Sequence, residues 1–149
     1  MLAVVALHRK KVLTYQILPE GQTMNSTLFV TFLQDYVKPN IRRLRIQRPL
    51  ILMDNARPHK AHIVTEFIAT TNWEVLKQDP YSPDEQPCDI DAFNRLKLRL
   101  RGRRLNTPQE LISAFDDVVT ELNNNAFTGI THLETTWLEI IENNGDYVV

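Results

Sequence analysis

The sequence predicts an α/β protein in which a mixed β-sheet is flanked by helices. Short apolar runs typical of strands alternate with segments whose apolar residues recur every three or four positions, in the order β-β-α-β-α-β-α-α-α. Hydrophobic residues make up 43% of the 149 residues, which is enough to bury a core. No internal repeat or long linker divides the chain, so we expect a single domain over residues 1–149.

The first elements are predicted to be a hairpin and a long helix. Two apolar runs, Met1–Leu7 and Val12–Leu18, are separated by four residues and are typical of antiparallel strands. Ser26 is an expected N-cap for a helix that reaches about Tyr36. Pro39 suits the first turn of a continuation of that helix.

A strand, a helix and a second strand are predicted next. The apolar run Pro49–Met53 indicates a buried strand. Pro58 suits the first turn of a helix that runs to about Thr70. Trp73–Leu76 indicates another strand, with Trp73 in the core. Three apolar residues of the helix are expected to face the core: Ile63, Phe67 and Ile68.

The last three elements are predicted to be helices. Ile90–Leu100 has helical spacing and is followed by Gly102, which is typical of a helix C-terminus. Thr107 is an expected N-cap, with Pro108 in the first turn of its helix. Leu133–Ile141 is the last predicted helix.

The bulk composition excludes some classes of protein. A net charge of −1 does not indicate a globally basic nucleic-acid binder, although arginines cluster locally. No apolar run approaches the roughly 18 to 20 residues of a membrane helix, and no signal peptide is evident. The single cysteine, Cys88, excludes an internal disulfide and suits a reducing compartment.

Two motifs contain the chemically informative residues. The first, Asp54-Asn55-Ala56-Arg57-Pro58-His59, directly follows the buried strand at Pro49–Met53. The second is Tyr81-Ser82-Pro83-Asp84-Glu85-Gln86-Pro87-Cys88-Asp89, and 34 residues separate Asp54 from Asp89. Carboxylates at a strand end and a helix start can meet at one edge of an α/β sheet, where hard divalent cations bind oxygen ligands. Either aspartate could instead be a helix N-cap.

Both motifs resemble the signature of mariner-type transposase catalytic domains, at that family's 34-residue spacing. The resemblance extends upstream through Leu18–Asn25 and downstream to Phe127–Ile130, Trp137 and Gly145–Tyr147, so it covers essentially the whole chain. It implies a ribonuclease H-like fold, with a short third hairpin strand expected at residues 22–25. It also implies phosphodiester cleavage and strand transfer in cut-and-paste DNA transposition. The family's helix-turn-helix DNA-binding region is expected to be absent from these 149 residues.

The resemblance implies specific roles for residues of this chain. Asp54 and Asp89 are expected to be catalytic ligands of two Mg²⁺ or Mn²⁺ ions. Aligning Val12 with the family's motif places His8 at the position of the first catalytic aspartate, although His8 could equally be an exposed hairpin residue. Imidazole in place of a carboxylate would favour Mn²⁺ over Mg²⁺ or abolish activity. The expected DNA-contacting residues are Asn55, Arg57, His59, Arg99, Arg101, Arg103 and Arg104.

The expected partners follow from the same resemblance. They are transposon ends and target DNA, with a possible homodimer, no membrane and no small-molecule substrate, and nuclear location follows only from the DNA. An alternative is a catalytically inactive, host-adopted or degenerate transposase remnant that acts as a DNA-binding or protein-association module. The substitution at His8 favours this alternative, whereas the two intact motifs favour the enzyme. The arginine clusters at residues 42–48 and 95–104 either bind phosphate or form solvated helix faces.

Overall fold

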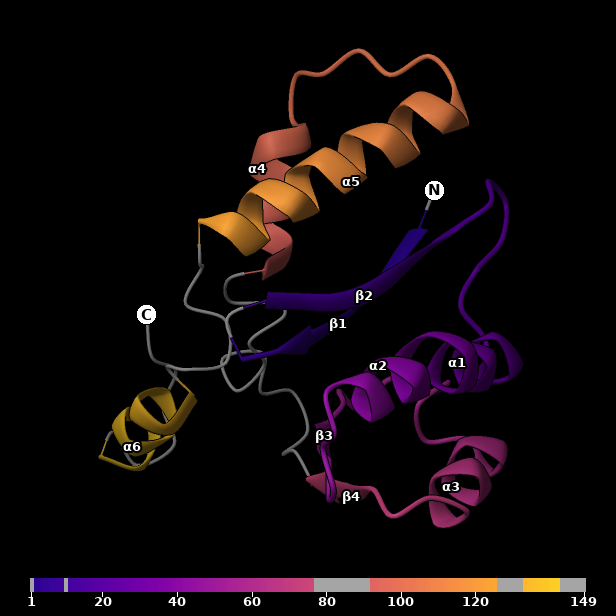
Figure 1. Ribbon diagram of the computed structural model, residues 1–149, viewed down its shortest axis with the longest axis vertical. Coiled ribbons are helices and arrows are strands. Elements are labelled where there is room, and N and C mark those ends of the chain that lie inside the picture. The colour runs from indigo at the N-terminus through magenta and orange to yellow at the C-terminus, as the bar shows by residue number, and fades with distance from the viewer. Residues whose placement is uncertain (1, 10, 77–91, 126–132, 143–149) are drawn as a thin grey trace. The chain divides into compact units, whose positions relative to one another are not determined.

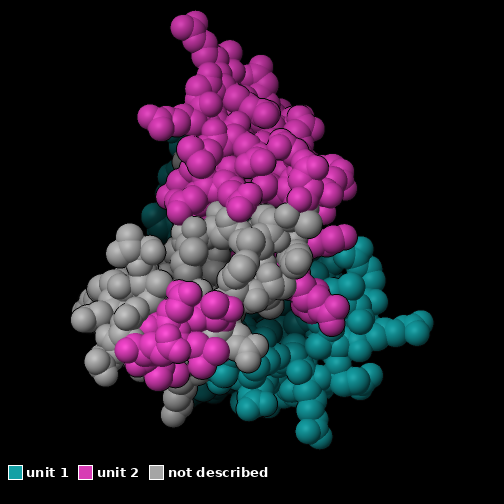
Figure 2. Space-filling model, turned by 90° about the vertical axis from the view of Figure 1, so that its left-hand side faces the viewer, with its two compact units in different colours: residues 1–6, 13–82 teal, residues 7–12, 83–149 magenta. Residues whose placement is uncertain are grey.

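The computed structural model describes residues 2–9, 11–76, 92–125 and 133–142 (Figure 1). The chain forms two compact units, which Figure 2 colours separately. The first unit contains residues 1–6 and 13–82, and the second contains residues 7–12 and 83–149. In the part of the chain that the structure describes, no helix has the length and apolar character needed to cross a membrane.

The predicted hairpin is present, with a shorter connection than expected. Strand β1 (Leu2–His8) pairs with β2 (Lys11–Leu18), so the connection has two residues rather than four. Arg9, the first of these, has a φ of 53°. Positive φ at this position is typical of two-residue hairpin turns, because their twist matches that of the strands.

The expectation of a third strand at residues 22–25 was wrong. These residues form no strand, because they serve a turn and a helix cap instead. The Gln22 amide donates to the Pro19 carbonyl at 3.1 Å, and Gly21 between them has a φ of 82°. The Asn25 side chain accepts from the Leu28 amide at 2.9 Å and is the N-cap of the next helix. Ser26, the predicted cap, is therefore the first residue inside the helix.

The first long helix is continuous but widens in its middle. Helix α1 (Ser26–Phe32) passes into the π-helical turn η1 (Leu33–Val37) and then into α2 (Lys38–Arg43). The Lys38 amide donates to the Leu33 carbonyl, five residues earlier. Pro39 has no amide hydrogen and its ring would crowd the preceding turn, so a wider turn just before it lets the helix continue.

Helix α2 ends in a Schellman motif with an unusual residue. The Ile46 amide donates to the Ile41 carbonyl at 3.2 Å, and the Arg45 amide donates to the Arg42 carbonyl at 3.0 Å. Ile46 also packs against the core cluster that contains Ile41. Arg45 has a φ of 55°, in the left-handed region that this motif usually fills with glycine. A non-glycine residue in this conformation costs roughly 1 kcal/mol.

A parallel strand pair follows in the first unit. Strands β3 (Leu50–Leu52) and β4 (Glu74–Leu76) pair in register, with Ile51 opposite Val75. Helix α3 (His62–Ala69) connects them, as parallel pairing requires. Both sheets described are two-stranded, one a hairpin and one parallel, in agreement with the prediction of a mixed α/β protein.

Helix α3 begins later than predicted. Residues 57–60 form turns, in which the His59 and Lys60 amides both donate to the Ala56 carbonyl, so Pro58 lies before the helix. This shift also changes the buried face. Ile63 is 41% exposed, contrary to expectation, whereas Val64 is fully buried.

The core of the first unit is built by the long helix, α3 and Trp73. Trp73 meets Phe67 edge to face, with ring centroids 5.7 Å apart, and the prediction that Trp73 belongs to the core is confirmed. The predicted core residues Phe67 and Ile68 are partly buried against this cluster. Its buried members are Phe29, Phe32, Leu33, Val37, Ile41, Val64 and Trp73.

The described residues of the second unit form helices α4 (Phe93–Leu100), α5 (Pro108–Asn124) and α6 (Leu133–Glu142). Thr107 and Glu110 form a capping box at the start of α5, so the predicted cap is confirmed.

Local backbone geometry in the second unit agrees with its sequence signals. Gly102, just beyond α4, has a φ of 81°, as its predicted role at the helix end requires. The Asn123 amide group holds the Val12 backbone on both sides, accepting from its N–H at 2.8 Å and donating to its carbonyl at 3.1 Å.

Candidate functional site

Asp54 lies two residues beyond the carboxyl end of β3, the edge of a parallel sheet at which sites usually form. Its side chain is 51% exposed. One carboxylate oxygen, Oδ1, accepts a hydrogen bond from the Ala56 amide at 3.0 Å. This bond closes a turn that fixes the carboxylate at the strand end. The N-cap position of α3 is held by Ala61, so Asp54 does not cap that helix.

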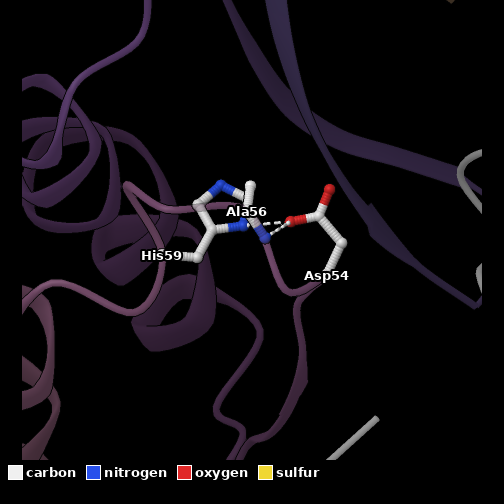
Figure 3. Close-up of polar contacts among 3 residues, drawn as sticks. All are labelled: Asp54, Ala56 and His59. Carbon is white, nitrogen blue, oxygen red and sulfur yellow. Dashed lines mark hydrogen bonds and ion pairs between the residues drawn. The ribbon is translucent and has the colours of Figure 1, made fainter. Parts of the chain in front are cut away.

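His59 is the second fixed group of the site. The turn that begins at Ala56 brings its Nδ1 atom to 2.5 Å from Asp54 Oδ1 (Figure 3). Nδ1 is buried and has no hydrogen bond of regular geometry, so the contact with Asp54 is a close polar approach rather than a well-angled hydrogen bond. The imidazole ring also packs against Phe29, with ring centroids 4.0 Å apart and planes tilted by 30°.

The two oxygens of Asp54 therefore differ. Oδ1 is directed at Ala56 and His59, whereas Figure 3 shows the second oxygen pointing away from both. A carboxylate whose direction is fixed through one oxygen is suited to bind a hard cation through the other, because partners behind a ligand fix its direction. The geometry is suited to Asp54 as one ligand of a metal ion, with the other ligands supplied by other groups.

The described residues do not complete a metal centre by themselves. No group of three or more His, Cys, Asp or Glu residues that could hold a metal occurs within residues 2–9, 11–76, 92–125 and 133–142. The second motif, residues 81–89, lies outside the described residues, and Asp89 with it. The structure therefore neither joins nor separates Asp54 and Asp89.

His8 is the last residue of β1 and is half-buried. Burial lowers its pKa below the usual 6.5, and the neighbouring Arg9 guanidinium lowers it further. The imidazole is therefore mainly neutral at pH 7. A neutral imidazole can act as a metal ligand, and it contributes no negative charge toward two dications.

The predicted DNA-contacting residues occupy different surroundings. Asn55 is half-buried and Arg57 is exposed in the turn after Asp54. Arg99 forms an ion pair with Glu121 on α5, with Nε 2.8 Å from Oε1, so part of its donor capacity is used inside the second unit. The other three arginines lie beyond α4 and are exposed: Arg101, Arg103 and Arg104.

Phe29 is a supporting residue that the sequence did not reveal as part of the site. It lies in the apolar stripe of α1, 30 positions before His59, and such a stripe is typical of any core helix. No local signal distinguishes the ring that packs on an imidazole from its neighbours in the stripe.

Residues 2–112 match the family described as DDE superfamily endonuclease. Histone-lysine N-methyltransferase SETMAR of Homo sapiens is 30% identical over 158 residues, which cover 95% of this chain and 23% of SETMAR. Mariner Mos1 transposase of Drosophila mauritiana is 28% identical over 147 residues, which cover 92% of this chain and 41% of that protein. The chain thus spans less than half the length of either relative.

Solved structures of Mos1 are similar to this chain. The catalytic domain of Mos1 mariner transposase has a TM-score of 0.87 at 26% identity, covering 99% of this chain and 75% of that one. Its structure with raltegravir and Mn has the same TM-score and identity, and covers 76% of that chain. A Mos1 paired-end complex with the left transposon end has a TM-score of 0.85 at 27% identity, covering 97% of this chain and 44% of that one.

These similarities confirm the ribonuclease H-like fold class and the resemblance to a mariner-type transposase catalytic domain. The family match spans well over half of the 149 residues. The chain belongs to the DDE superfamily endonuclease family.

Proposed function

We propose that this chain is a mariner-type transposase catalytic domain in which Asp54 binds a divalent cation for phosphoryl transfer on DNA. The observation that carries the proposal is the orientation of Asp54 at the end of β3, with one oxygen held by Ala56 and His59 and the other pointing away from both (Figure 3). The Mos1 catalytic domain has been solved with Mn and with Mg, which supports either ion as the cofactor. Asp89 is the proposed second ligand.

The protein groups orient and bind rather than attack. When bound, divalent cations activate the attacking water or 3′-hydroxyl and stabilise the leaving oxygen. The Ala56 amide and His59 fix the direction of the Asp54 carboxylate, and Phe29 fixes the plane of the imidazole. No side chain is required as a nucleophile.

The DNA partner is part of the same proposal. A Mos1 structure contains a paired-end complex with the left transposon end, which supports DNA binding and the pairing of two copies. Arg57 beside the site and the exposed arginines beyond α4 are proposed to contact the phosphate backbone. Nuclear location is proposed from the DNA substrate alone.

The role of His8 depends on which strand of the fold β1 represents. The ribonuclease H-like fold usually has three strands before its first long helix, and here two precede α1, with none at residues 22–25. If β1 is the first strand, His8 stands where the first aspartate is expected. If β1 and β2 are the second and third strands, that aspartate belongs to a strand outside these 149 residues.

We favour the second assignment of the strands. It requires no strand to be lost between β2 and α1, where the chain instead forms a turn and a helix cap. The alignment with the Mos1 catalytic domain also leaves a quarter of that structure without a counterpart. In this assignment His8 is a hairpin residue rather than a failed metal ligand.

The second candidate function is a non-catalytic module that retains the fold for DNA binding or protein association. It is favoured if His8 stands at the first aspartate position, because the site then lacks one carboxylate. Only the first candidate predicts a cation at Asp54.

Nicking of supercoiled plasmid in Mg²⁺ and in Mn²⁺ tests these alternatives. The proteins to compare are the native chain, His8→Asp, and His8→Asp combined with Asp54→Ala. A gain of nicking in His8→Asp that the added Asp54→Ala removes would place His8 at the first aspartate position. No gain, together with Mn²⁺ binding that depends on Asp54, is the result we expect. Inactivity of all three folded proteins without such Mn²⁺ binding would reject the catalytic proposal.

A further inference from the structure

A polar groove lies in the first unit. None of its lining residues belongs to the motif that contains Asp54. It has a volume of about 330 Å³ and lies between the end of α2 and the connection from α3 to β4. Its lining residues are Lys38, Ile41, Arg42, Ile46, Gln47, Thr70, Thr71, Asn72 and Trp73. No acidic residue is among them, and two are cations.

The neutral polar groups of the groove already serve the fold. The Thr70 hydroxyl donates to the Phe67 carbonyl at 2.7 Å, and the Thr71 hydroxyl donates to the Ile68 carbonyl at 2.6 Å. The Asn72 side-chain amide donates to the Gln47 carbonyl and ties the two connections together. The donors that remain for a ligand are the side-chain amide of Gln47 and the charged groups of Lys38 and Arg42, and the two charges favour an anion.

The chain around the groove is strongly basic. Between Asp35 and Asp54 the sequence contains no acidic residue and five cations, which are Lys38, Arg42, Arg43, Arg45 and Arg48. All four arginines are exposed.

A simpler explanation is that these cations only offset the dipoles of the helices that end here. Each helix C-terminus carries roughly half a negative charge. The ends of α2 and α3 together account for about one of the five positive charges, so most of the charge has no such function.

The backbone at Arg45 provides an independent indication. This arginine occupies the left-handed position of the Schellman motif, where glycine would relieve the strain. A strained position that is not filled by glycine is a starting point for a functional hypothesis. The side chain begins directly beside Ile46, which lines the groove.

We propose that this groove binds a phosphate of the DNA backbone, with Lys38 and Arg42 as the groups inside it and Arg45 and Arg48 at its border. The site rests on the proposed function, since DNA is the substrate that the family acts on, and it lies outside the motifs that contain Asp54 and Asp89. It contacts the backbone and reads no base sequence, because point charges on exposed side chains recognise phosphate rather than base edges.

The test is binding of a fluorescent 20-base-pair duplex of arbitrary sequence to the whole chain, measured by anisotropy in EDTA over a range of salt concentrations. Omitting the divalent cation separates this test from the metal site. The variant removes both groove cations, Lys38→Gln with Arg42→Gln. The matched control, Arg9→Gln with Lys11→Gln, removes one arginine and one lysine charge from two exposed positions of the hairpin. Circular dichroism confirms that each protein is folded.

We expect the groove variant to bind about tenfold more weakly and to lose about 2 from the slope of log affinity against log salt, since each phosphate contact contributes about 0.9. The control should lose clearly less. The charge-preserving variant Lys38→Arg with Arg42→Lys should restore the slope. Equal losses in the groove variant and the control would overturn the proposal. Equal affinity of the native chain for polyglutamate of the same charge would also overturn it.

An Asp54→Asn protein distinguishes the groove from the metal site. It should bind the duplex in EDTA as the native chain does, because the groove does not use the carboxylate. Failure of the groove variant to differ from the native chain would reject the groove alone and leave the metal site untouched.

Discussion

Two polar regions of the first unit lie at opposite ends of strand β3 and are built in opposite ways. After the strand, Asp54 is fixed by an amide and an imidazole that is itself packed on Phe29. Before the strand, exposed arginines surround a groove in which the side chains of Thr70, Thr71 and Asn72 are already bonded to the backbone. The first region fixes the direction of one carboxylate. The second places several positively charged side chains close together, and they are exposed.

The difference corresponds to two tasks. Metal-assisted phosphoryl transfer depends on ligand direction, because a misplaced ligand loses much of the cation's effect. Holding a phosphate backbone depends mainly on the number and position of positive charges. Substitutions that affect one region should therefore leave the other unchanged, and the predictions at Phe29, His59 and Arg45 use this separation.

The largest effect is expected at Phe29. Replacing it with alanine should lower the free energy of unfolding by about 3–5 kcal/mol, because the ring is buried and leaves a cavity. Urea denaturation measures this loss. Phe29→Leu keeps most of the volume and should cost less than about 1.5 kcal/mol. The leucine variant should weaken Mn²⁺ binding through His59 while its DNA affinity in EDTA stays native. Equal losses of both affinities would contradict the separation.

The next largest effect is expected at His59. His59→Gln removes the imidazole behind Asp54 and should weaken Mn²⁺ binding about tenfold, as loss of a group that orients a ligand typically does. The control is His62→Gln, because His62 is exposed and its ion-pair partner, Glu66, is 3.4 Å away on the surface. Isothermal titration with Mn²⁺ measures both. The same weakening in both variants would show that His59 does not orient the site.

Arg45→Gly should have a smaller effect, and it should raise stability while it lowers affinity for DNA. Relief of the positive φ should raise the free energy of unfolding by about 1 kcal/mol. Loss of the charge should reduce duplex affinity about twofold to threefold. Arg43→Gly is the matched control, because it removes the same charge from inside α2 and should destabilise by about 1 kcal/mol. If Arg45→Gly lowered the free energy of unfolding, the claim that the positive φ at this position is strained would be rejected.

The smallest effect is expected from His8. Its folded-state pKa lies below 6.5 because of burial and Arg9, so the unfolded chain takes up the proton more readily. Stability from this residue is complete above pH 6.5 and falls as the pH drops through 6.5 toward the folded-state pKa. Urea midpoints between pH 7.5 and pH 5.5 measure this slope. His8→Gln should make it shallower, and an unchanged slope would mean that another group titrates.

The order of the elements was predictable because it depends on local signals. The cap at Thr107 and the glycine after α4 are recognisable in any context, and the structure confirms both. Other details depend on contacts distant in sequence. Val64 rather than Ile63 is buried because the turn after Asp54 delays α3, and no periodicity in the helix itself encodes that delay.

The candidate site was predictable to the same limited extent. Asp54 and His59 belong to one motif, and the proximity of their side chains follows from a tight turn. Phe29 comes from a distant helix, and only the packed unit brings its ring to the imidazole. The strand assignment that we propose for His8 also depended on the structure, because residues 19–28 form a turn and a helix cap rather than the predicted third strand.

Binding of Mn²⁺ followed by electron paramagnetic resonance tests the central claim most directly. Free Mn²⁺ gives a strong signal that decreases when the ion is bound, so the whole chain can be titrated without DNA. Asp54→Asn keeps the shape of the side chain and removes its charge, and Asp35→Asn is the control at an exposed aspartate of η1. We predict that the native chain and Asp35→Asn bind Mn²⁺ alike and that Asp54→Asn binds at least about tenfold more weakly. Equal Mn²⁺ binding by all three proteins would contradict the account.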